Sequence, residues 1–276
     1  MEMSWLEGLI FGFISGLTEF LPISPQAHSA LFLKLTGSTE GALTRLTIHL
    51  GVLTALLIAC APVLSRLNRE RRIAAIPKNR RKRQPDMKSL LEIRVLKTAA
   101  VSLLVSFLAW PLVHNLHERL WVLALFMAVN GMVLYVPQFL PGANKDARSL
   151  SAVDAFLIGL GAGAGVIPGI SRIGTAVSTG LVRGTERRYA LDIALLLCIP
   201  ALIVTLFIDL IGMFSGLGGI SLIRILTSIF AGAAAFGGAT VGIFSMRFLS
   251  FKTGFSGFAY YCWGIALFAF ILYLTI

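Results

Sequence analysis

Residues 16–28 read Gly-Leu-Thr-Glu-Phe-Leu-Pro-Ile-Ser-Pro-Gln-Ala-His, an ionisable, proline-broken stretch inside an otherwise apolar segment. Residues 161–176 form a second interrupted stretch, Gly-Ala-Gly-Ala-Gly-Val-Ile-Pro-Gly-Ile-Ser-Arg-Ile-Gly-Thr-Ala. An ionisable side chain at membrane depth is costly, so it indicates a functional site with a partner to be found. Glu19 and His28 in the first stretch and Arg172 in the second therefore predict one shared site for an anionic headgroup.

The composition of the chain is that of a polytopic membrane protein. Of its 276 residues, 57% are hydrophobic and only 13% are charged, and the mean hydropathy is +0.84. These values lie far outside the usual range of a soluble globular domain. The chain is expected to cross the membrane several times.

Apolar length predicts the membrane spans, because a helix needs about 20 mostly apolar residues to cross a bilayer. Six stretches qualify, and they are Leu46 to Leu64, Thr98 to Val113, Leu120 to Leu140, Tyr189 to Ile211, Ile223 to Phe248 and Phe255 to Ile276. Residues 5–35 and 153–181 are apolar but interrupted, so we assign both as re-entrant helix-loop-helix hairpins. The fold class is all-α integral membrane, with six transmembrane helices and two hairpins.

The net charge of +11 comes mainly from one segment. Residues 66–97 hold twelve Lys or Arg and three acids, which gives this segment a net charge of +9. We predict that residues 66–97 form a cytoplasmic loop, because basic residues in a loop between spans mark the cytoplasmic side. The first re-entrant hairpin then enters from the outer face and the second from the inner face. We interpret the segment as a topology signal that also touches anionic lipid, and we expect no nucleic-acid partner.

The two hairpins resemble each other in sequence. Residues 21–24, Leu-Pro-Ile-Ser, parallel residues 167–171, Ile-Pro-Gly-Ile-Ser, with one inserted glycine. We predict a single membrane domain, 1–276, in which repeat one (1–140) and repeat two (151–276) have inverted topology. Sites in such proteins lie near the bilayer midplane, between broken helices. A chance match of two short motifs is the alternative.

The second break has the residues of a phosphate cradle. A helix N-terminus presents unpaired N–H groups that attract phosphate. Gly169 allows close approach of the backbone, Ser171 adds a hydroxyl, and Arg172 adds a bidentate fork. The alternative is an ordinary helix start with an arginine that extends to the interface.

The first break supplies groups for metal binding and proton transfer. Glu19 could share a divalent cation with a substrate phosphate, or it could be a carboxyl kept neutral by burial. His28 could act as nucleophile or as general acid and base, or it could be a hydrogen-bonded interfacial histidine. Ser24 is equally a helix-cap candidate and a phosphate ligand.

These motifs resemble the undecaprenyl-pyrophosphate phosphatase family, the BacA-type bacitracin-resistance proteins. The likeness in length, span order and motif separation covers essentially the whole chain. It implies a bacterial inner-membrane protein that removes one phosphate from the C55 isoprenyl pyrophosphate and so recycles the lipid carrier of peptidoglycan precursors. It also implies a requirement for Mg²⁺ or Ca²⁺ and a pocket open to the periplasmic side.

The family roles carry over by position. Glu19 matches the second acid of the family's acid-x-x-x-Glu motif, His28 matches its histidine, and Ser171 and Arg172 match the Ser-Arg of its second motif. Glu19, His28 and Arg172 are therefore the candidate catalytic residues, with Glu19 the candidate metal ligand. The candidate substrate ligands are Ser24, Gly169, Ser171, Arg172 and Thr175.

The chain departs from the family pattern at several of these positions. Ser15 stands where the family has Glu or Gln, Pro25 replaces a serine, and Ile173 replaces the serine after the arginine. Further departures lie at Gln26, Ala27, Arg45, His49, Thr175 and Ala176. One missing polar contact can cost a hundredfold or more in rate, so weak activity, an altered substrate and no catalysis all stay open.

Two hypotheses follow for function. The first is a membrane phosphatase in which Glu19 binds a cation, Arg172 holds the phosphates and His28 handles the proton or attacks phosphorus. The second is a catalytically decayed relative that binds or translocates polyprenyl phosphate or another anionic lipid, since inverted repeats with broken helices also build transporters. Chain length of the lipid and a homodimer are left open.

Overall fold

The computed structural model describes residues 3–113, 115–116, 119–140, 142, 144–215, 221–252 and 255–275. Within these ranges the protein is helical, and six helices are long and apolar enough to cross a membrane. They are Ala42–Ala75, Met87–Val113, Leu120–Phe139, Arg187–Phe214, Leu222–Leu249 and Ser256–Thr275. Each contains or overlaps one predicted span, which confirms a multi-pass membrane protein. Ile276, the end of the last predicted span, lies outside the described residues.

Both interrupted segments form two helices separated by a break. The first segment gives α1 (Trp5–Phe20) and α2 (Pro25–Thr36), and the second gives α7 (Ala152–Gly163), η5 (Ala164–Val166) and α8 (Arg172–Val182). Proline has no N–H and disfavours helical backbone in the residue before it, so Pro22 and Pro168 explain where the helices stop. The re-entrant placement of these segments and the inverted repeat stay predictions.

The remaining helices connect and surround these segments. They are α3 (Ala42–Ala75), η1 (Lys78–Arg80), α4 (Met87–Ser106), η2 (Phe107–Ala109), α5 (Trp110–Val113), α6 (Leu120–Tyr135), η4 (Val136–Phe139), α9 (Arg187–Ser215), α10 (Leu222–Lys252) and α11 (Ser256–Thr275).

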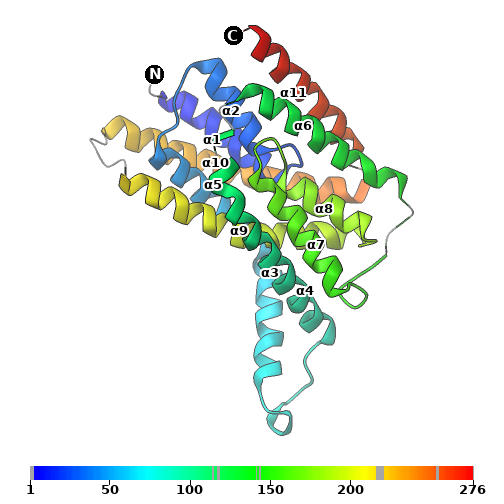
Figure 1. The fold of residues 1–276 in the computed structure, drawn as a ribbon. Coiled ribbons are helices and arrows are strands. Elements are labelled where there is room, and N and C mark those ends of the chain that lie inside the picture. Colours follow the sequence, from blue (N-terminus) through cyan, green and yellow to red (C-terminus); the bar gives the residue numbers. More distant parts are fainter. Residues whose placement is uncertain are drawn as a thin grey trace.

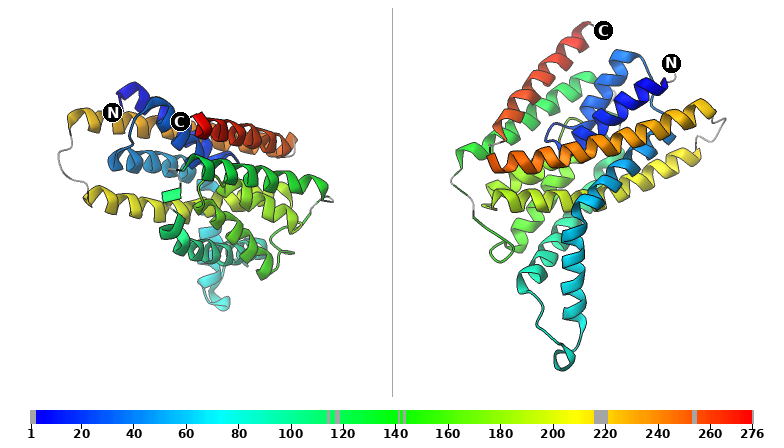
Figure 2. Two further views of the ribbon diagram at one scale, coloured as in Figure 1. Left: turned by 45° about the horizontal axis from the view of Figure 1, so that its top comes forward. Right: turned by 180° about the vertical axis from the view of Figure 1, so that it is seen from behind.

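Helices of each half of the chain pack against helices of the other half. Helix α1 of the first segment lies along α10, and α7 of the second segment lies along α4. Figure 2 shows the first of these pairs from behind, with the blue and orange helices next to each other. Helix α3 also packs on α10 and α9, and α6 packs on α11, so further contacts join the halves. The N-terminal helix of each broken segment thus packs on a helix of the other half.

Glycines allow two of these pairs to approach very closely. A Cβ atom on Gly12 of α1 would lie 2.1 Å from the carbonyl oxygen of Ala231, and one on Gly238 of α10 would lie 2.2 Å from that of Phe13. In the other pair, a Cβ on Gly159 of α7 would lie 2.0 Å from the carbonyl oxygen of Ala99. Small residues at helix interfaces are the usual basis of membrane helix packing.

The basic segment 66–97 is largely helical rather than a loop. Helix α3 continues to Ala75 and α4 begins at Met87, so the two form a hairpin that projects from the rest of the bundle (Figure 1). The 34 residues of α3 correspond to about 51 Å of helix at 1.5 Å per residue, against roughly 30 Å of hydrocarbon. Helix α3 is therefore much longer than the hydrocarbon core is thick.

Alanine substitutions of two adjacent glycines in α10 test its close approach to α1. Gly238→Ala places a methyl group against the backbone of α1, whereas a Cβ on Gly237 would have no described residue within 4 Å. We expect Gly238→Ala to lower the free energy of unfolding by about 1–3 kcal/mol through overpacking. Gly237→Ala should raise it by about 0.5–1 kcal/mol, because alanine favours helix.

Equilibrium unfolding of both variants in detergent measures this difference. Equal stability of the two variants would contradict the assigned contact between α1 and α10.

Candidate functional site

A buried asparagine of α6 joins the two helix breaks. The side-chain amide of Asn130 donates to the carbonyl oxygen of Pro22 (3.0 Å), and its amide oxygen accepts from the backbone N–H of Ser171 (2.9 Å). Asn130 is completely buried. One side chain therefore satisfies a backbone acceptor of the first break and a backbone donor of the second, and it holds the breaks against each other.

Two predicted substrate ligands, Ser171 and Thr175, make structural hydrogen bonds where the two helix breaks meet, a place that we call the junction. The Ser171 hydroxyl donates to the carbonyl oxygen of Leu21 (3.2 Å) and accepts from the N–H of Gly174 (3.2 Å), so it caps α8. The Thr175 hydroxyl donates to the carbonyl oxygen of Ser171 (2.7 Å). Both hydroxyls can reach a substrate only if these hydrogen bonds are exchanged.

The junction brings Glu19 and Arg172 together, as the sequence predicts. Nη1 of Arg172 lies 3.0 Å from Oε1 of Glu19, although the residues are 153 positions apart. Their side chains are only 12% and 10% exposed, respectively. A buried charge is strongly unfavourable unless it is paired, so each side chain makes the burial of the other tolerable. The pair lies where the end of α1 meets the start of α8.

The backbone is unusual at Ser24 and Gly169, one residue in each break. Ser24 has φ +53°, the only positive φ among the described residues other than glycine, and Gly169 has φ +95°. The Ser24 hydroxyl is fully buried and has no hydrogen-bond partner in the part of the chain that the structure describes. Ser24 precedes α2 without capping it, which leaves the phosphate-ligand interpretation open and removes the cap interpretation.

His28 faces a different helix. Its Nδ1 lies 2.8 Å from the carbonyl oxygen of Ser24, and its Nε2 lies 2.8 Å from the hydroxyl of Tyr261 in α11. Since Nδ1 faces an acceptor, it carries the proton, and Nε2 accepts from Tyr261. Within the described ranges, no hydrogen bond joins His28 to Glu19 or Arg172.

Two further ion pairs lie beside α3 and were missed as site features. Nδ1 of His49 lies 2.6 Å from Oδ2 of Asp209 in α9, and Nε of Arg45 lies 3.2 Å from Oε2 of Glu40. The sequence gives no signal for either pairing, because the partners are distant in the chain or sit at the ends of spans. Asn130 is different, since an amide in the middle of an apolar span is itself a signal of buried hydrogen bonding.

The side chains present do not form a ready metal centre. Among the residues that the structure describes, no group of three or more His, Cys, Asp or Glu side chains could hold a metal ion. Glu19 supplies a carboxylate at the junction, and Arg172 contacts one of its oxygens. Mg²⁺ usually takes one or two carboxylates together with substrate phosphates, so Glu19 could hold a cation only together with the phosphates of a bound substrate, and we derive no step through a metal.

Fold and site together define a multi-pass membrane protein with a buried guanidinium–carboxylate pair where two broken helical segments meet. A family model described as "Bacitracin resistance protein BacA" matches residues 8–268. The match covers most of the chain. The chain belongs to the BacA family.

Three relatives of this chain are named undecaprenyl-diphosphatase. The chain is 30% identical over 275 residues to the undecaprenyl-diphosphatase of Methanobrevibacter smithii, with 98% of each chain covered. It is 29% identical to the undecaprenyl-diphosphatase of Carboxydothermus hydrogenoformans, over 95% of this chain and 94% of the relative. The undecaprenyl-diphosphatase of a Nocardioides species is 31% identical over 73% of each chain.

The bridge made by Asn130 can be tested by an apolar substitution. Asn130→Leu leaves the carbonyl of Pro22 and the N–H of Ser171 buried without their partner, at about 1–3 kcal/mol each. We expect the free energy of unfolding to fall by about 2–5 kcal/mol. The matched control is Asn79→Leu in η1, where the side chain is exposed and the change should stay within about 0.5 kcal/mol.

Chemical unfolding in detergent compares the two variants. If Asn130→Leu unfolded no more easily than Asn79→Leu, the hydrogen bonds across the two breaks would not hold them together.

Proposed function

We propose that this protein hydrolyses undecaprenyl pyrophosphate to the monophosphate and inorganic phosphate. The observation that carries the proposal is the buried pair of Glu19 and Arg172 at the junction of the two breaks. Arg172 is the cation that a pyrophosphate needs, and the broken helices supply backbone N–H groups around it. Membership of the BacA family and the names of the relatives support the same activity.

Arg172 is the group that holds the phosphates. Only one of its guanidinium nitrogens, Nη1, bonds to Glu19, so the N–H groups on the other nitrogens can donate to phosphate oxygens without breaking the pair. Glu19 then serves to fix the plane of the guanidinium. The hydroxyl of Ser24, which has no partner among the described residues, is the further donor that we assign to the substrate.

The chemical step transfers the terminal phosphoryl group to water. A water oxygen attacks the terminal phosphorus, the anhydride P–O bond breaks, and the lipid monophosphate leaves with the electrons of that bond. Arg172 stabilises the negative charge that develops on the oxygens, which is the largest contribution a protein can make to this reaction. The proton of the attacking water needs a base, and we assign this role to Nε2 of His28, which must first exchange its hydrogen bond with Tyr261.

A second candidate function has its own support. The hydroxyls of Ser171 and Thr175 are committed to structural hydrogen bonds, and His28 faces Tyr261. A chain with this arrangement could bind a polyprenyl phosphate at Arg172 without cleaving it. In that case the protein would be a binding or translocating relative of the phosphatases.

The proposed setting is the bacterial inner membrane. The strongly basic hairpin would lie in the cytoplasm, and the site would open to the periplasmic side. The substrate is then a membrane lipid that reaches the site from the bilayer.

Phosphate release by purified protein separates the two functions. For the phosphatase, we expect Glu19→Gln and His28→Ala to lower the release rate at least a hundredfold, in the range seen when one group that stabilises a transition state is lost. Binding of the lipid should persist in both variants. Arg172→Ala should abolish both release and binding, because it removes the cation.

Arg80→Gln, an exposed change at the far end of the hairpin, is the control that should release phosphate at the wild-type rate. Measurable binding of the lipid by a wild-type protein that releases no phosphate would support the second function. Wild-type release from all three site variants would remove the site assignment.

The metal requirement is a separate expectation. We expect release of phosphate to need Mg²⁺ or Ca²⁺ and to stop when a chelator is added, because one carboxylate and one guanidinium leave most of the pyrophosphate charge without a partner. The measurement is release with each cation and after chelation. If phosphate release continued at the same rate after chelation, the metal requirement would be wrong, and the protein alone would stabilise the negative charge of the pyrophosphate.

A further inference from the structure

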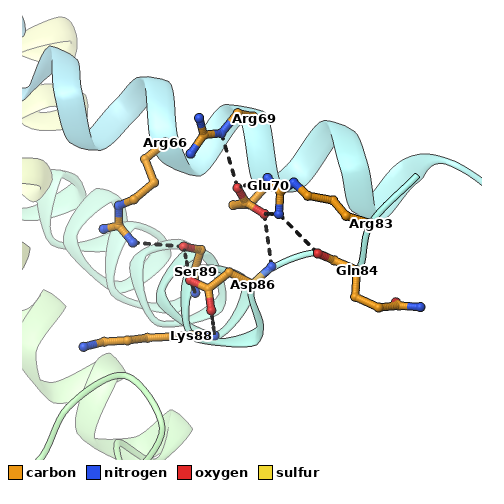
Figure 3. Close-up of polar contacts among 8 residues, drawn as sticks. All are labelled: Arg66, Arg69, Glu70, Arg83, Gln84, Asp86, Lys88 and Ser89. Carbon is orange, nitrogen blue, oxygen red and sulfur yellow. Dashed lines mark hydrogen bonds and ion pairs between the residues drawn. The ribbon is translucent and has the colours of Figure 1, made fainter. Parts of the chain in front are cut away.

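The α3–α4 hairpin, residues 66–97, buries two of its three acids, Glu70 and Glu92. Glu70 is only 3% exposed. Its carboxylate accepts from Nη2 (2.6 Å) and Nη1 (3.1 Å) of Arg83 and from the backbone N–H of Asp86 (3.0 Å), and it also contacts Nε of Arg69 (3.3 Å). Figure 3 shows this carboxylate between α3 and the turn that leads to α4. Glu70 therefore fixes the tip of the hairpin.

The other two acids of the hairpin are used in the same way. Asp86 caps α4 and accepts from the hydroxyl of Ser89, and these hydrogen bonds lower its pKa. Glu92 is 5% exposed and pairs with Nη2 of Arg66 (2.8 Å), whose Nη1 donates to Ser89 (2.9 Å). All three carboxylates therefore form hydrogen bonds within the hairpin and stabilise its fold.

The outward surface of the hairpin is consequently basic. Seven exposed side chains of residues 66–97 form no salt bridge with any residue that the structure describes, and they are Arg71, Arg72, Lys78, Arg80, Lys82, Arg94 and Lys97. Fixed positive charges of this density attract an anionic surface.

A groove lies at the root of the hairpin. It has a volume of about 280 Å³ and runs between α4 and residues 147–155. Arg94 and Thr98 line one wall and Arg148 lines the other, while the buried side chains of Val95 and Ala155 contribute apolar surface. Two guanidinium groups from separate elements therefore face an apolar floor.

The charge around the groove is positive. Asp146, in the same turn as Arg148, lies 3.7 Å from Nζ of Lys88. Its pKa is lowered first by the N–H of Arg148 and then by the charges of Lys88 and Arg148. Neither Arg94 nor Arg148 forms a salt bridge within the described ranges. Both guanidinium groups therefore keep their donors for a ligand.

The depth of the groove matches that of a lipid headgroup. Arg94 precedes Thr98, where the apolar stretch begins, by four residues, or about 6 Å along the helix. The headgroup region of a bilayer extends roughly 5–7 Å beyond the hydrocarbon on each side. With the hydrocarbon boundary placed at Thr98, where the predicted span begins, Arg94 falls at the level of lipid phosphates.

We propose that this groove binds the phosphate of an anionic phospholipid from the leaflet on the hairpin side. Arg94 and Arg148 donate to the phosphate oxygens from opposite walls, and Val95 and Ala155 contact the glycerol and the first methylene groups. The basic surface of the hairpin raises the local concentration of anionic lipid. The apolar floor favours a lipid over a nucleic acid or an acidic protein, neither of which needs it. This site is separate from the Glu19–Arg172 pair.

The test is binding of a fluorescent phosphatidylglycerol to the purified full-length protein in nonionic detergent. The double variant Arg94→Gln/Arg148→Gln removes the guanidinium group from each wall of the groove. The control, Arg72→Gln/Lys82→Gln, removes the same charge from the hairpin beyond the groove. We expect the groove variant to bind at least tenfold more weakly, because two charge-assisted hydrogen bonds are lost, and the control to change less than about threefold.

Competitors distinguish the ligands. Millimolar inorganic phosphate should not displace the lipid, and zwitterionic phosphatidylcholine should bind more weakly. If both double variants lost affinity for the lipid equally, general charge attraction would explain the binding, and the proposed site would be wrong. Displacement by inorganic phosphate would assign the groove to free phosphate, and displacement by an oligonucleotide from wild type and both variants alike would assign the surface to polyanions. Each of these results would reject the lipid.

Folding of the groove variant is checked by its unfolding temperature, which should equal that of the control. If the double variant does not fold, Arg94→Lys and Arg148→Lys keep the charge but lose the planar fork. Each should then weaken binding by about threefold. Wild-type affinity in both lysine variants would contradict the proposed contacts.

Discussion

A helix that breaks inside an apolar environment frees backbone N–H and C=O groups that must be satisfied by the protein itself. This constraint organises the centre of the molecule, where Asn130 satisfies one group from each of two breaks. The same hydrogen bonds bring the end of α1 to the start of α8, so that Glu19 meets Arg172. The ion pair therefore depends on neutral hydrogen bonds that come from a third helix.

The sequence predicts the frame of this arrangement better than its details. Hydropathy places the six long helices, and proline and glycine place both breaks, because these signals are local. The pairing of Glu19 with Arg172 is predictable because a buried charge requires a partner. The different states of Ser171 and Ser24 are not predictable. Ser171 bonds to Leu21, which is distant in sequence, whereas the Ser24 hydroxyl has no partner among the residues that the structure describes.

Close backbone approach explains why the frame holds. The contacts of α1 with α10 and of α7 with α4 both rely on glycine facing a carbonyl oxygen, and each joins a broken segment to a helix of the other half. Apolar side chains gain little by leaving lipid, so small residues and dispersion contacts have to supply the association. The composition signals an abundance of glycine, but only the structure shows which ones touch another helix.

The hairpin of α3 and α4 separates two properties that are usually linked. Two of its three acids are buried, and their hydrogen bonds determine how the turn folds, whereas most of its bases are exposed and form no ion pair with the residues that the structure describes. Substitutions on the outer face can therefore change the surface potential while the folded shape is kept. An evolving lineage is free to adjust how strongly this part of the protein attracts anions, because the fold of the hairpin does not constrain that choice.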